Sequence, residues 1–233
     1  HCADRPGSRV RLPCTGQCFA PVPSSIMVHA DIPLPELDPC MTTPPISRFP
    51  VPALDSLPDD IRTRILGVQE KSGFVPNVFL ALAHRPDEFR AFFAYNDAVM
   101  EKDGGLSKAE REMIVVATSA ANQCHYCVVS HGAILRIRAK NPLLADQIAN
   151  NYRKADITPR QRAMLDFAVK VCLEAQKTSP QDFEILRGHG FSDDDIWDIA
   201  AIAAFFALSN RMASLTDMRP NDEFYMMGRV PKA

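Results

Sequence analysis

Helix-starting patterns recur along this chain, and they constrain its fold more than any other feature. In a capping box, a Ser or Thr side chain accepts a hydrogen bond from the third helical amide, and the side chain three residues later returns one. The pattern occurs at Ser107-x-x-Glu110 and Thr158-x-x-Gln161, and in a similar acidic form at Ser192-x-x-Asp195. Each start is followed by apolar residues at helical spacing. No segment alternates apolar and polar residues long enough to be a convincing strand, so we predict an all-α fold.

From about Leu57 onward the chain reads as almost entirely helical. The predicted helices are Leu57–Ser72, Phe79–Ala83, Asp87–Met100, Ser107–Ala121, Cys124–Lys140, Thr158–Lys177, Pro180–Gly188 and Ser192–Leu215. Gly104-Gly105 and Pro142 interrupt this series. The last helix has few polar residues between Trp197 and Phe206, so we expect it to be buried on most sides, in the core or in an interface.

The first 40 residues differ from the rest in composition. They contain seven prolines and show no persistent helical or strand period. We therefore predict that residues 1–40 are a disordered extension, followed by a helical domain at 41–233. On this hypothesis the functional protein begins near Met41.

A weak internal repeat links two of the predicted helices. Leu106–Ala120 resembles Ile157–Val171 at an offset of 51 residues. The matched pairs are Arg111 with Arg162, Met113 with Met164, and Ala117 with Ala168. Glu112 falls opposite Ala163, and the second copy has no C-x-x-C. This difference indicates a shared helical scaffold with chemistry in one copy only.

Charge and cysteine content narrow the class of protein. A net charge of -2 gives no electrostatic reason to expect nucleic acid or an anionic membrane as a partner. No apolar run approaches the ~20 residues of a membrane span, and the first residues lack the apolar segment of a secretory signal. The chain has seven cysteines, and an odd number argues against a secreted disulfide framework. We expect a cytoplasmic protein that binds neither nucleic acid nor membrane.

The segment CHYCVVSH at 124–131 combines a C-x-x-C pair with a histidine four residues later. Spacings of three and four place Cys124, Cys127 and His131 on one stripe of a helix. If a helix begins at the Asn122-Gln123 junction, its free amides and dipole stabilise thiolates, the nucleophilic form of cysteine. His131 can accept a thiol proton or return one to a leaving oxygen. The combination points to thiol redox chemistry.

Glu112 lies twelve residues before Cys124 and is followed directly by Met-Ile-Val-Val. Two interpretations of this carboxylate stay open. Burial would raise its pKa and suit it to proton exchange with His131. Alternatively it is a solvated first-turn carboxylate favoured by the helix dipole, which is what we expect of Glu110.

A metal site is the weaker interpretation of the cysteine pair. Structural zinc needs four ligands, and His125 points roughly 100° away from Cys124 on an ideal helix. Cys172 is predicted to be a small, buried residue on a helix. We therefore expect neither a metal nor a cofactor.

The pattern Glu112-x11-Cys124-x-x-Cys127-x3-His131 resembles the signature of the carboxymuconolactone decarboxylase superfamily, in its alkylhydroperoxidase D (AhpD)-like redox branch. The resemblance covers roughly Ile46 to Arg229. Three segments resemble the peroxidase-related subgroup of this branch, namely GFVPNVFLALAHRPDEFRAFF (73–93), CHYCVVSHGA (124–133) and RPNDEFYMMGR (219–229). The resemblance implies an all-helical AhpD-like fold, a homo-oligomer (trimer or hexamer) with sites near subunit contacts, and thiol-dependent reduction of a hydroperoxide substrate.

The resemblance also implies a role for each site residue. Cys127 would attack the peroxide, Cys124 would resolve the sulfenic acid as a disulfide, and His131 and Glu112 would relay protons. An external dithiol would then reduce the disulfide. Related proteins have a histidine at the position of Tyr126, whereas here the histidine is its neighbour.

Two further points stay open at the level of sequence. The first thiol of a C-x-x-C at a helix start is commonly the more exposed. The alternative assignment, in which Cys124 attacks the peroxide and Cys127 resolves the sulfenic acid, therefore stays open. The alternative functions are a general thiol–disulfide oxidoreductase and a non-catalytic redox-sensing oligomer.

Overall fold

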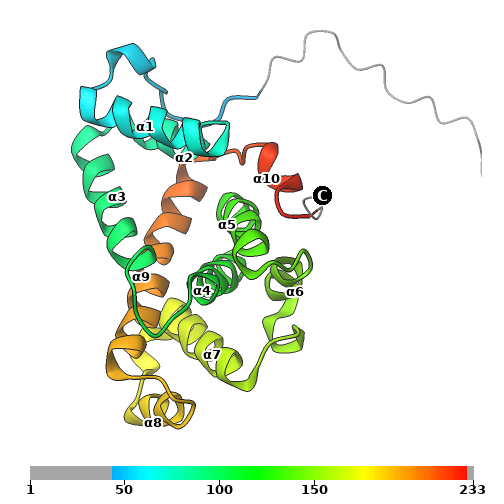
Figure 1. The fold of residues 1–233 in the computed structure, drawn as a ribbon. Coiled ribbons are helices and arrows are strands. Elements are labelled where there is room, and N and C mark those ends of the chain that lie inside the picture. The colour runs from blue at the N-terminus through cyan, green and yellow to red at the C-terminus, as the bar shows by residue number, and fades with distance from the viewer. Residues whose placement is uncertain (1–43, 230–233) are drawn as a thin grey trace, which may run out of the picture. The chain divides into compact units, whose positions relative to one another are not determined.

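The structure is a computed structural model that describes residues 44–229 (Figure 1). The predicted extension at 1–40 lies outside the described residues. Within 44–229 the chain forms helices and no strands, which confirms the all-α prediction. The α-helices are α1 (Asp59–Ser72), α2 (Asn77–Leu82), α3 (Pro86–Met100), α4 (Lys108–Ala121), α5 (His125–Ala139), α6 (Leu144–Asn151), α7 (Pro159–Glu174), α8 (Pro180–Gly188), α9 (Asp193–Thr216) and α10 (Glu223–Met226). Three 3₁₀ turns join them, namely η1 (Leu54–Ser56), η2 (Tyr152–Lys154) and η3 (Ala175–Lys177).

The predicted capping residues begin their helices in the structure. Reciprocal capping boxes open α4 at Ser107, α7 at Thr158 and α9 at Ser192. Gly73 ends α1 with φ of 84°, a left-handed conformation that glycine adopts without steric cost. Helices α6 and α10 were not predicted, because both are short and lack a capping box. Short helices of this kind depend on tertiary contacts.

Helix α4 lies at the centre of the main core. Its residues from 110 to 119 are all buried, and it packs against α5, α6, α7 and α9. The two repeat copies form α4 and α7, and the matched Met113 and Met164 are both fully buried. Burial also overturns the expectation of a solvated Glu110, whose carboxylate closes the capping box and pairs with Arg160. The repeat therefore preserves packing positions.

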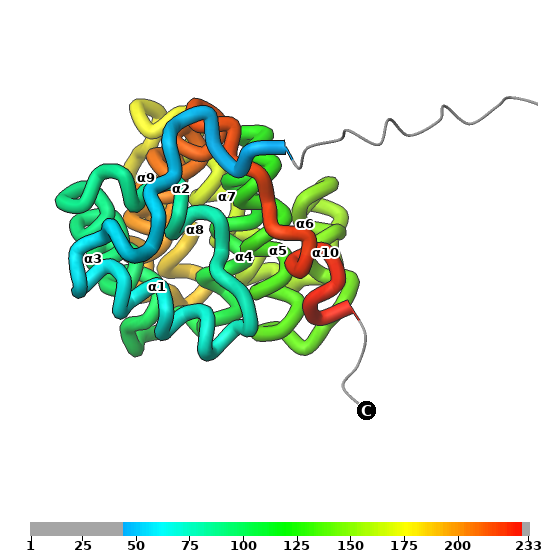
Figure 2. The backbone as a smooth tube through the Cα atoms, turned by 90° about the horizontal axis from the view of Figure 1, so that it is seen from above, coloured from blue at the N-terminus to red at the C-terminus, as the bar shows by residue number. Residues whose placement is uncertain are grey.

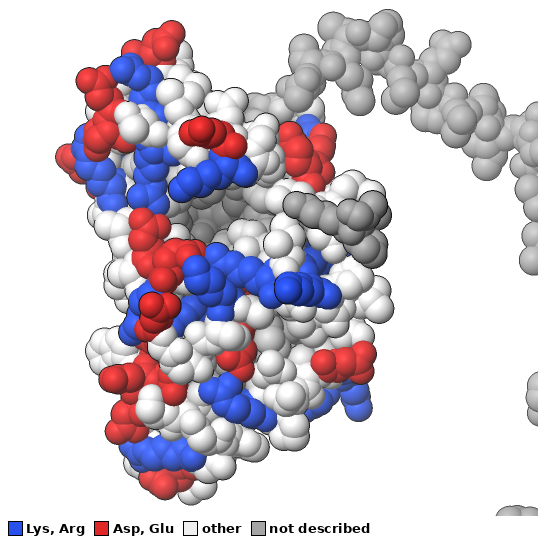
Figure 3. Space-filling view, in the orientation of Figure 1, with Lys and Arg blue, Asp and Glu red and all other residues white. Residues whose placement is uncertain are grey.

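Helices α1, α2 and α3 build a second, smaller core at one side of the molecule (Figures 1 and 2). Helix α9 runs between α3 and α4 and contacts both. The space where α2, α5 and the last turns of α9 meet holds a third apolar cluster, and both C-x-x-C residues belong to it. Acidic and basic side chains lie interspersed over the face drawn in Figure 3.

Candidate active site

A tight junction between α4 and α5 positions the cysteine pair. Asn122 ends α4, Gln123 adopts a left-handed φ of 54°, and Cys124 is the N-cap of α5. The Cys124 amide donates to the carbonyl oxygen of Ser119 at 2.9 Å, which fixes the turn. Cys127 therefore lies in the first turn of α5, where backbone amides lack helical partners and favour negative charge.

Both thiols are reduced and buried, each with 2% of its surface exposed. The pKa of the Cys124 thiol is lowered to about 7, chiefly by a hydrogen bond from the Cys127 thiol. Burial opposes this shift, whereas the Cys127 amide, Asn210 and the charge of His131 add to it. The pKa of Cys127 is raised, because its thiol donates to Cys124 and because it is buried. The two sulfurs therefore share one proton near neutral pH, with the negative charge mainly on Cys124.

Polar side chains of α9 face this pair. Ser209 Oγ lies 3.9 Å from the Cys127 sulfur. The Asn210 amide is 1% exposed and lowers the pKa of both thiols. Its orientation is determined by its partners, because its Oδ1 accepts from Asn122 Nδ2 at 2.8 Å and its Nδ2 donates to Ser119 Oγ at 2.9 Å. The donor side of the Asn210 amide is thereby held toward the sulfurs.

The partners of Asn210 lie far from it in the sequence, because Asn122 and Ser119 are 88 and 91 positions away. Asn122 also donates to the Cys172 sulfur at 3.1 Å. Cys172 is half-buried on α7, in contact with this polar network rather than in a fully apolar site.

His131 and Glu112 lie in direct contact. His131 Nδ1 is 2.7 Å from Glu112 Oε2, and the carboxylate is 2% exposed. Of the two interpretations of Glu112, the structure selects the buried one. The ring of Phe206 packs edge-on against the imidazole at a centroid distance of 4.7 Å, which orients the ring. The imidazole keeps about a fifth of its surface exposed, so it can exchange protons with solvent.

Arg138 is a further member of this group, and nothing in the sequence pattern singled it out. Its Nη1 lies 3.3 Å from Glu112 Oε1, an ion pair without good hydrogen-bond alignment. Its Nη2 donates to Glu101 at 2.7 Å, and Glu101 in turn accepts from Lys108 at 2.8 Å. Arg138 lies seven residues, about two helical turns, after His131 on α5, and this spacing was the signal that could have pointed to it. The guanidinium offsets the cost of burying the Glu112 charge.

The other two residues of the C-x-x-C segment lie apart from the proton relay. The Tyr126 ring is buried beside the thiols, and its hydroxyl accepts the Val78 amide of α2 at 3.0 Å. His125 is exposed and hydrogen-bonds Tyr225 of α10 at 2.9 Å. Neither side chain takes the place of His131. Within residues 44–229 no group of three His, Cys, Asp or Glu side chains is placed to hold a metal ion.

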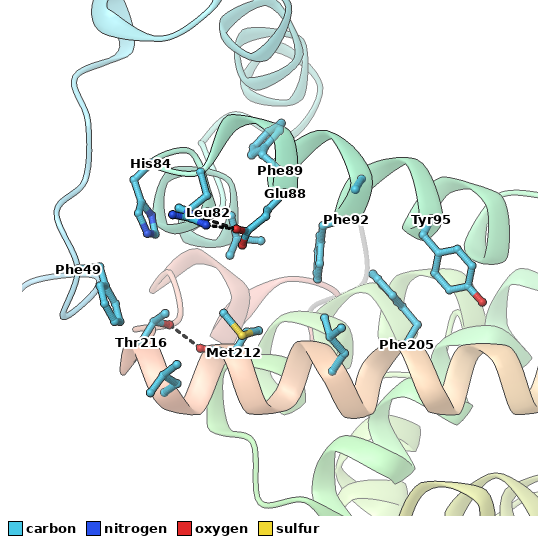
Figure 4. A pocket seen from close by; sticks show the side chains of 14 residues that line it. Phe49, Leu82, His84, Glu88, Phe89, Phe92, Tyr95, Phe205, Met212 and Thr216 are labelled. Atoms are coloured by element: carbon cyan, nitrogen blue, oxygen red, sulfur yellow. Dashed lines mark hydrogen bonds and ion pairs between the residues drawn. The ribbon is translucent and has the colours of Figure 1, made fainter.

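A large cavity lies on the other side of α9. It has a volume of about 620 Å³ and is lined mostly by apolar and aromatic side chains of α3 and α9 (Figure 4). Phe92, Tyr95, Phe205 and Met212 form part of its wall. Cys124, Cys127 and His131 do not line it, so the thiol pair is enclosed rather than open to this cavity.

Comparison with known proteins places these observations in a family. The sequence model of the "Carboxymuconolactone decarboxylase family" matches residues 86–150, which include the whole Glu112–His131 segment. No curated protein matches the chain.

Three solved structures illustrate the similarity. An AhpD-core, uncharacterized peroxidase-related protein from Ralstonia eutropha JMP134 is 75% identical, with a TM-score of 0.80 over 81% of this chain and 99% of that one. An uncharacterized peroxidase-related protein from Silicibacter sp. TM1040 is 43% identical, with a TM-score of 0.77 over 81% and 100%. The apo debrominase Bmp8 is 21% identical, with a TM-score of 0.62 over 77% and 93%, and shows a shared fold alone.

Proposed function

The chain belongs to the carboxymuconolactone decarboxylase family, among its AhpD-like, peroxidase-related members, and from this premise we propose that it is a thiol-dependent hydroperoxidase. The observation that carries the proposal is the pair of reduced, buried thiols at the start of α5, one helical turn before a His131 that is hydrogen-bonded to Glu112. A peroxidase of this kind needs a thiolate, a second thiol within bonding reach and a group that protonates the leaving alcohol.

The first step is attack of a thiolate on the distal oxygen of an alkyl hydroperoxide. The O–O bond breaks, the alcohol leaves with a proton from His131, and a cysteine sulfenic acid remains. The second thiol then attacks that sulfur, which forms the disulfide and releases water. An external dithiol reduces the disulfide by exchange and becomes oxidised itself. No cofactor takes part in these steps.

We assign the attack to Cys127 and the resolving role to Cys124. The charge of the resting pair lies mainly on Cys124, so this assignment requires the shared proton to cross from Cys127 to Cys124 before attack. Ser209 and Asn210 support that transfer, because both lower the pKa of Cys127.

His131 and Glu112 complete the relay. Glu112 accepts a hydrogen bond from the Nδ1–H group of His131. The other ring nitrogen, Nε2, therefore points away from the carboxylate. Arg138 Nη1 lies 3.3 Å from Glu112 Oε1, and this cation offsets part of the cost of burying the carboxylate. We propose that His131→Gln lowers turnover by roughly 10²- to 10⁴-fold, the usual contribution of a general acid–base group.

Single-cysteine variants test the cycle. With cumene hydroperoxide and dithiothreitol in a stopped-flow assay, Cys127→Ser should abolish turnover, while Cys124→Ser should leave a trapped sulfenic acid detectable by mass spectrometry. Cys172→Ser is the matched control, because this third cysteine lies outside the pair, and it should retain turnover within about twofold.

Two outcomes would count against the assignment. Full activity of Cys127→Ser, or the absence of a sulfenic acid at Cys127 in Cys124→Ser, would overturn the assignment of the attack to Cys127. Slow peroxide reduction beside fast reduction of insulin disulfides would favour the alternative, a general thiol–disulfide oxidoreductase. Its basis in the structure is the thiol pKa near 7, which suits exchange at neutral pH.

A further inference from the structure

A row of charged side chains leads from the surface of the protein to the buried carboxylate beside His131. Its members alternate in sign and each contacts the next, in the order Lys108, Glu101, Arg138, Glu112 and His131. The exposed fraction of the side chain falls from 57% at Lys108 to 2% at Glu112. His131 and Arg138 approach different oxygens of the Glu112 carboxylate. The group around His131 therefore extends beyond Glu112, toward ions that solvent reaches.

Three helices contribute to this row. His131 and Arg138 are seven residues apart on α5, so their side chains leave the helix on one face. Glu101 is the C-cap of α3, and Lys108 is the first residue of α4. Glu101 reaches Arg138 across 37 positions of sequence. The place of the guanidinium is therefore determined by the junction between α3 and α4 as well as by its own helix.

The guanidinium of Arg138 is shared unequally between two carboxylates. Its Nη2 donates to Glu101 Oε1 at 2.7 Å. Its Nη1 is buried 3.3 Å from Glu112 Oε1 and makes no hydrogen bond. Arginine beside a carboxylate commonly donates two parallel hydrogen bonds. Glu101 thus holds the guanidinium back from Glu112, whose closer contact is His131 Nδ1 at 2.7 Å.

The other charged groups near these helices are occupied elsewhere. On α5, the thiols of Cys124 and Cys127 precede His131 by about two turns and one turn. From α9, the uncharged ring of Phe206 packs on the imidazole. Further ion pairs lie on α6, α7 and α9, and within residues 44–229 no hydrogen bond or ion pair links them to the His131–Glu112 pair. They are Asp146 with Arg229, Arg160 with Glu110, and Asp198 with Arg111 and Lys102. In the described part of the chain, Arg138 is therefore the one cation besides His131 that pairs with Glu112.

Arg138 and Glu101 act in opposite directions on the proton of the His131–Glu112 pair. Because imidazole and carboxylate are in direct contact, they titrate as one unit. A cation beside Glu112 makes it easier for this unit to lose its proton, since the deprotonated unit carries one more negative charge. Glu101 binds that cation and weakens its effect on Glu112. Removal of Arg138 and removal of Glu101 should therefore have effects of opposite sign.

From these contacts we propose that Arg138 and Glu101 are positioning residues that set how tightly the His131–Glu112 pair holds its proton. Arg138 loosens the hold, and Glu101 limits this effect by keeping the guanidinium from closing on Glu112. Both act through the carboxylate and not on the peroxide. The use of this device rests on the proposed function. A general acid that holds its proton too tightly does not release it to the leaving alcohol, and one that holds it too loosely is empty at neutral pH.

The first test follows the proton of His131 without any turnover. The reduced full chain is labelled with ¹³C-histidine, and the ring signal of His131, identified by its loss in His131→Gln, is recorded by NMR against pH. Arg138→Met should raise the midpoint of this titration by about one pH unit, and Glu101→Gln should lower it by about half a unit. Arg138→Lys keeps a cation and should stay closer to the wild type than to Arg138→Met.

Two further variants show whether Glu101 acts through Arg138. In Glu101→Gln/Arg138→Met the midpoint should equal that of Arg138→Met, because Glu101 then has no cation to hold. Arg187→Met is the matched control, since it removes a cation from exposed ion pairs with Glu184 and Asp193, and it should leave the midpoint unchanged. An unchanged midpoint in Arg138→Met, or shifts of the same sign in both single variants, would overturn the proposal. If Arg138→Met does not fold, an unchanged midpoint in Glu101→Gln has the same meaning, because Glu101 is 47% exposed and tolerates the change.

The second test separates this inference from the proposed function. The pH dependence of kcat/KM with cumene hydroperoxide should shift in each variant in the same direction as the NMR midpoint of His131. An NMR midpoint that shifts beside an unshifted turnover profile would support the role of Arg138 and Glu101, and it would count against His131 as the proton donor in turnover.

Discussion

A single amide on α9 adds to the hydrogen bond between the two thiols of α5, because it lowers the pKa of both sulfurs. Asn210 is held by Asn122 and Ser119, so the direction in which it donates does not depend on the thiols themselves. A hydrogen bond to a charged group contributes about 1.5–3 kcal/mol, and much of that is retained when the donor is already oriented. The side chain of Asn210 therefore favours the thiolate form in the reduced protein, without a bound substrate.

The pH at which the thiolate forms is a direct consequence. In the reduced protein we expect one thiol to titrate at about pH 7, well below the ordinary value for cysteine, as measured by thiolate absorbance at 240 nm and by the rate of alkylation at Cys124. Asn210→Ala should raise this pKa by about one unit, because the thiolate loses a charge-assisted hydrogen bond.

Asn122→Ala is the control for that measurement, since its amide contacts Asn210 and Cys172 but is not among the causes of the shift at Cys124. It should shift the titration less than Asn210→Ala. Equal shifts in both variants would show that Asn210 lowers the thiol pKa only while Asn122 holds it in place. The pKa of Cys124 is lower in the folded protein than in the unfolded chain, so ionisation of this thiol raises the free energy of unfolding at high pH. This contribution is lost as the pH falls through about 7.

At the scale of elements, the junction between α4 and α5 determines where the cysteine pair lies. Two helices that meet at a sharp turn place a C-terminal carbonyl and an N-terminal set of amides next to each other, and the cysteine pair begins where the amides are free. The turn is achieved by Gln123 in a left-handed conformation, which a residue with a Cβ adopts only at a cost.

This cost predicts opposite effects of glycine at two positions. Gln123→Gly should leave the free energy of unfolding unchanged or raise it by up to about 1 kcal/mol, because glycine tolerates φ of 54°, while Gln123→Val should lower it by about 1–2 kcal/mol. Ala94→Gly, at an exposed position within α3, should lower it by about 1 kcal/mol. Urea denaturation measures all three. A loss of stability in Gln123→Gly equal to that in Ala94→Gly would show that the turn is not strained.

At the scale of the whole molecule, the thiols lie against the inner side of α9, whereas the apolar side chains of Trp197, Leu208 and Leu215 are exposed on its outer side. Disulfide closure within one turn of α5 needs only a small local movement. The exposed surface of the protein, and with it the mass in solution, should therefore not respond to the redox state.

We accordingly expect the same mass for the protein oxidised with one equivalent of cumene hydroperoxide and for the protein reduced with dithiothreitol. Light scattering of the two forms, with the disulfide verified by mass spectrometry, measures this. A mass that changes reversibly with the redox state would favour the remaining alternative, a redox-sensing oligomer. Cys127→Ser, which cannot form the disulfide, serves as the control and should show one mass under both conditions.

The sequence by itself determined the helical class, most helix starts and the shared stripe of Cys124, Cys127 and His131. These properties are local: capping boxes and the 3.6-residue period act over a few neighbouring residues. Only the tertiary structure decided that Glu112 is buried against His131 and Arg138, and that Asn210 is aimed at the sulfurs by partners 88 and 91 positions away. It also decided that Trp197 points outward, because which side of an apolar helix is covered depends on how the other helices pack around it.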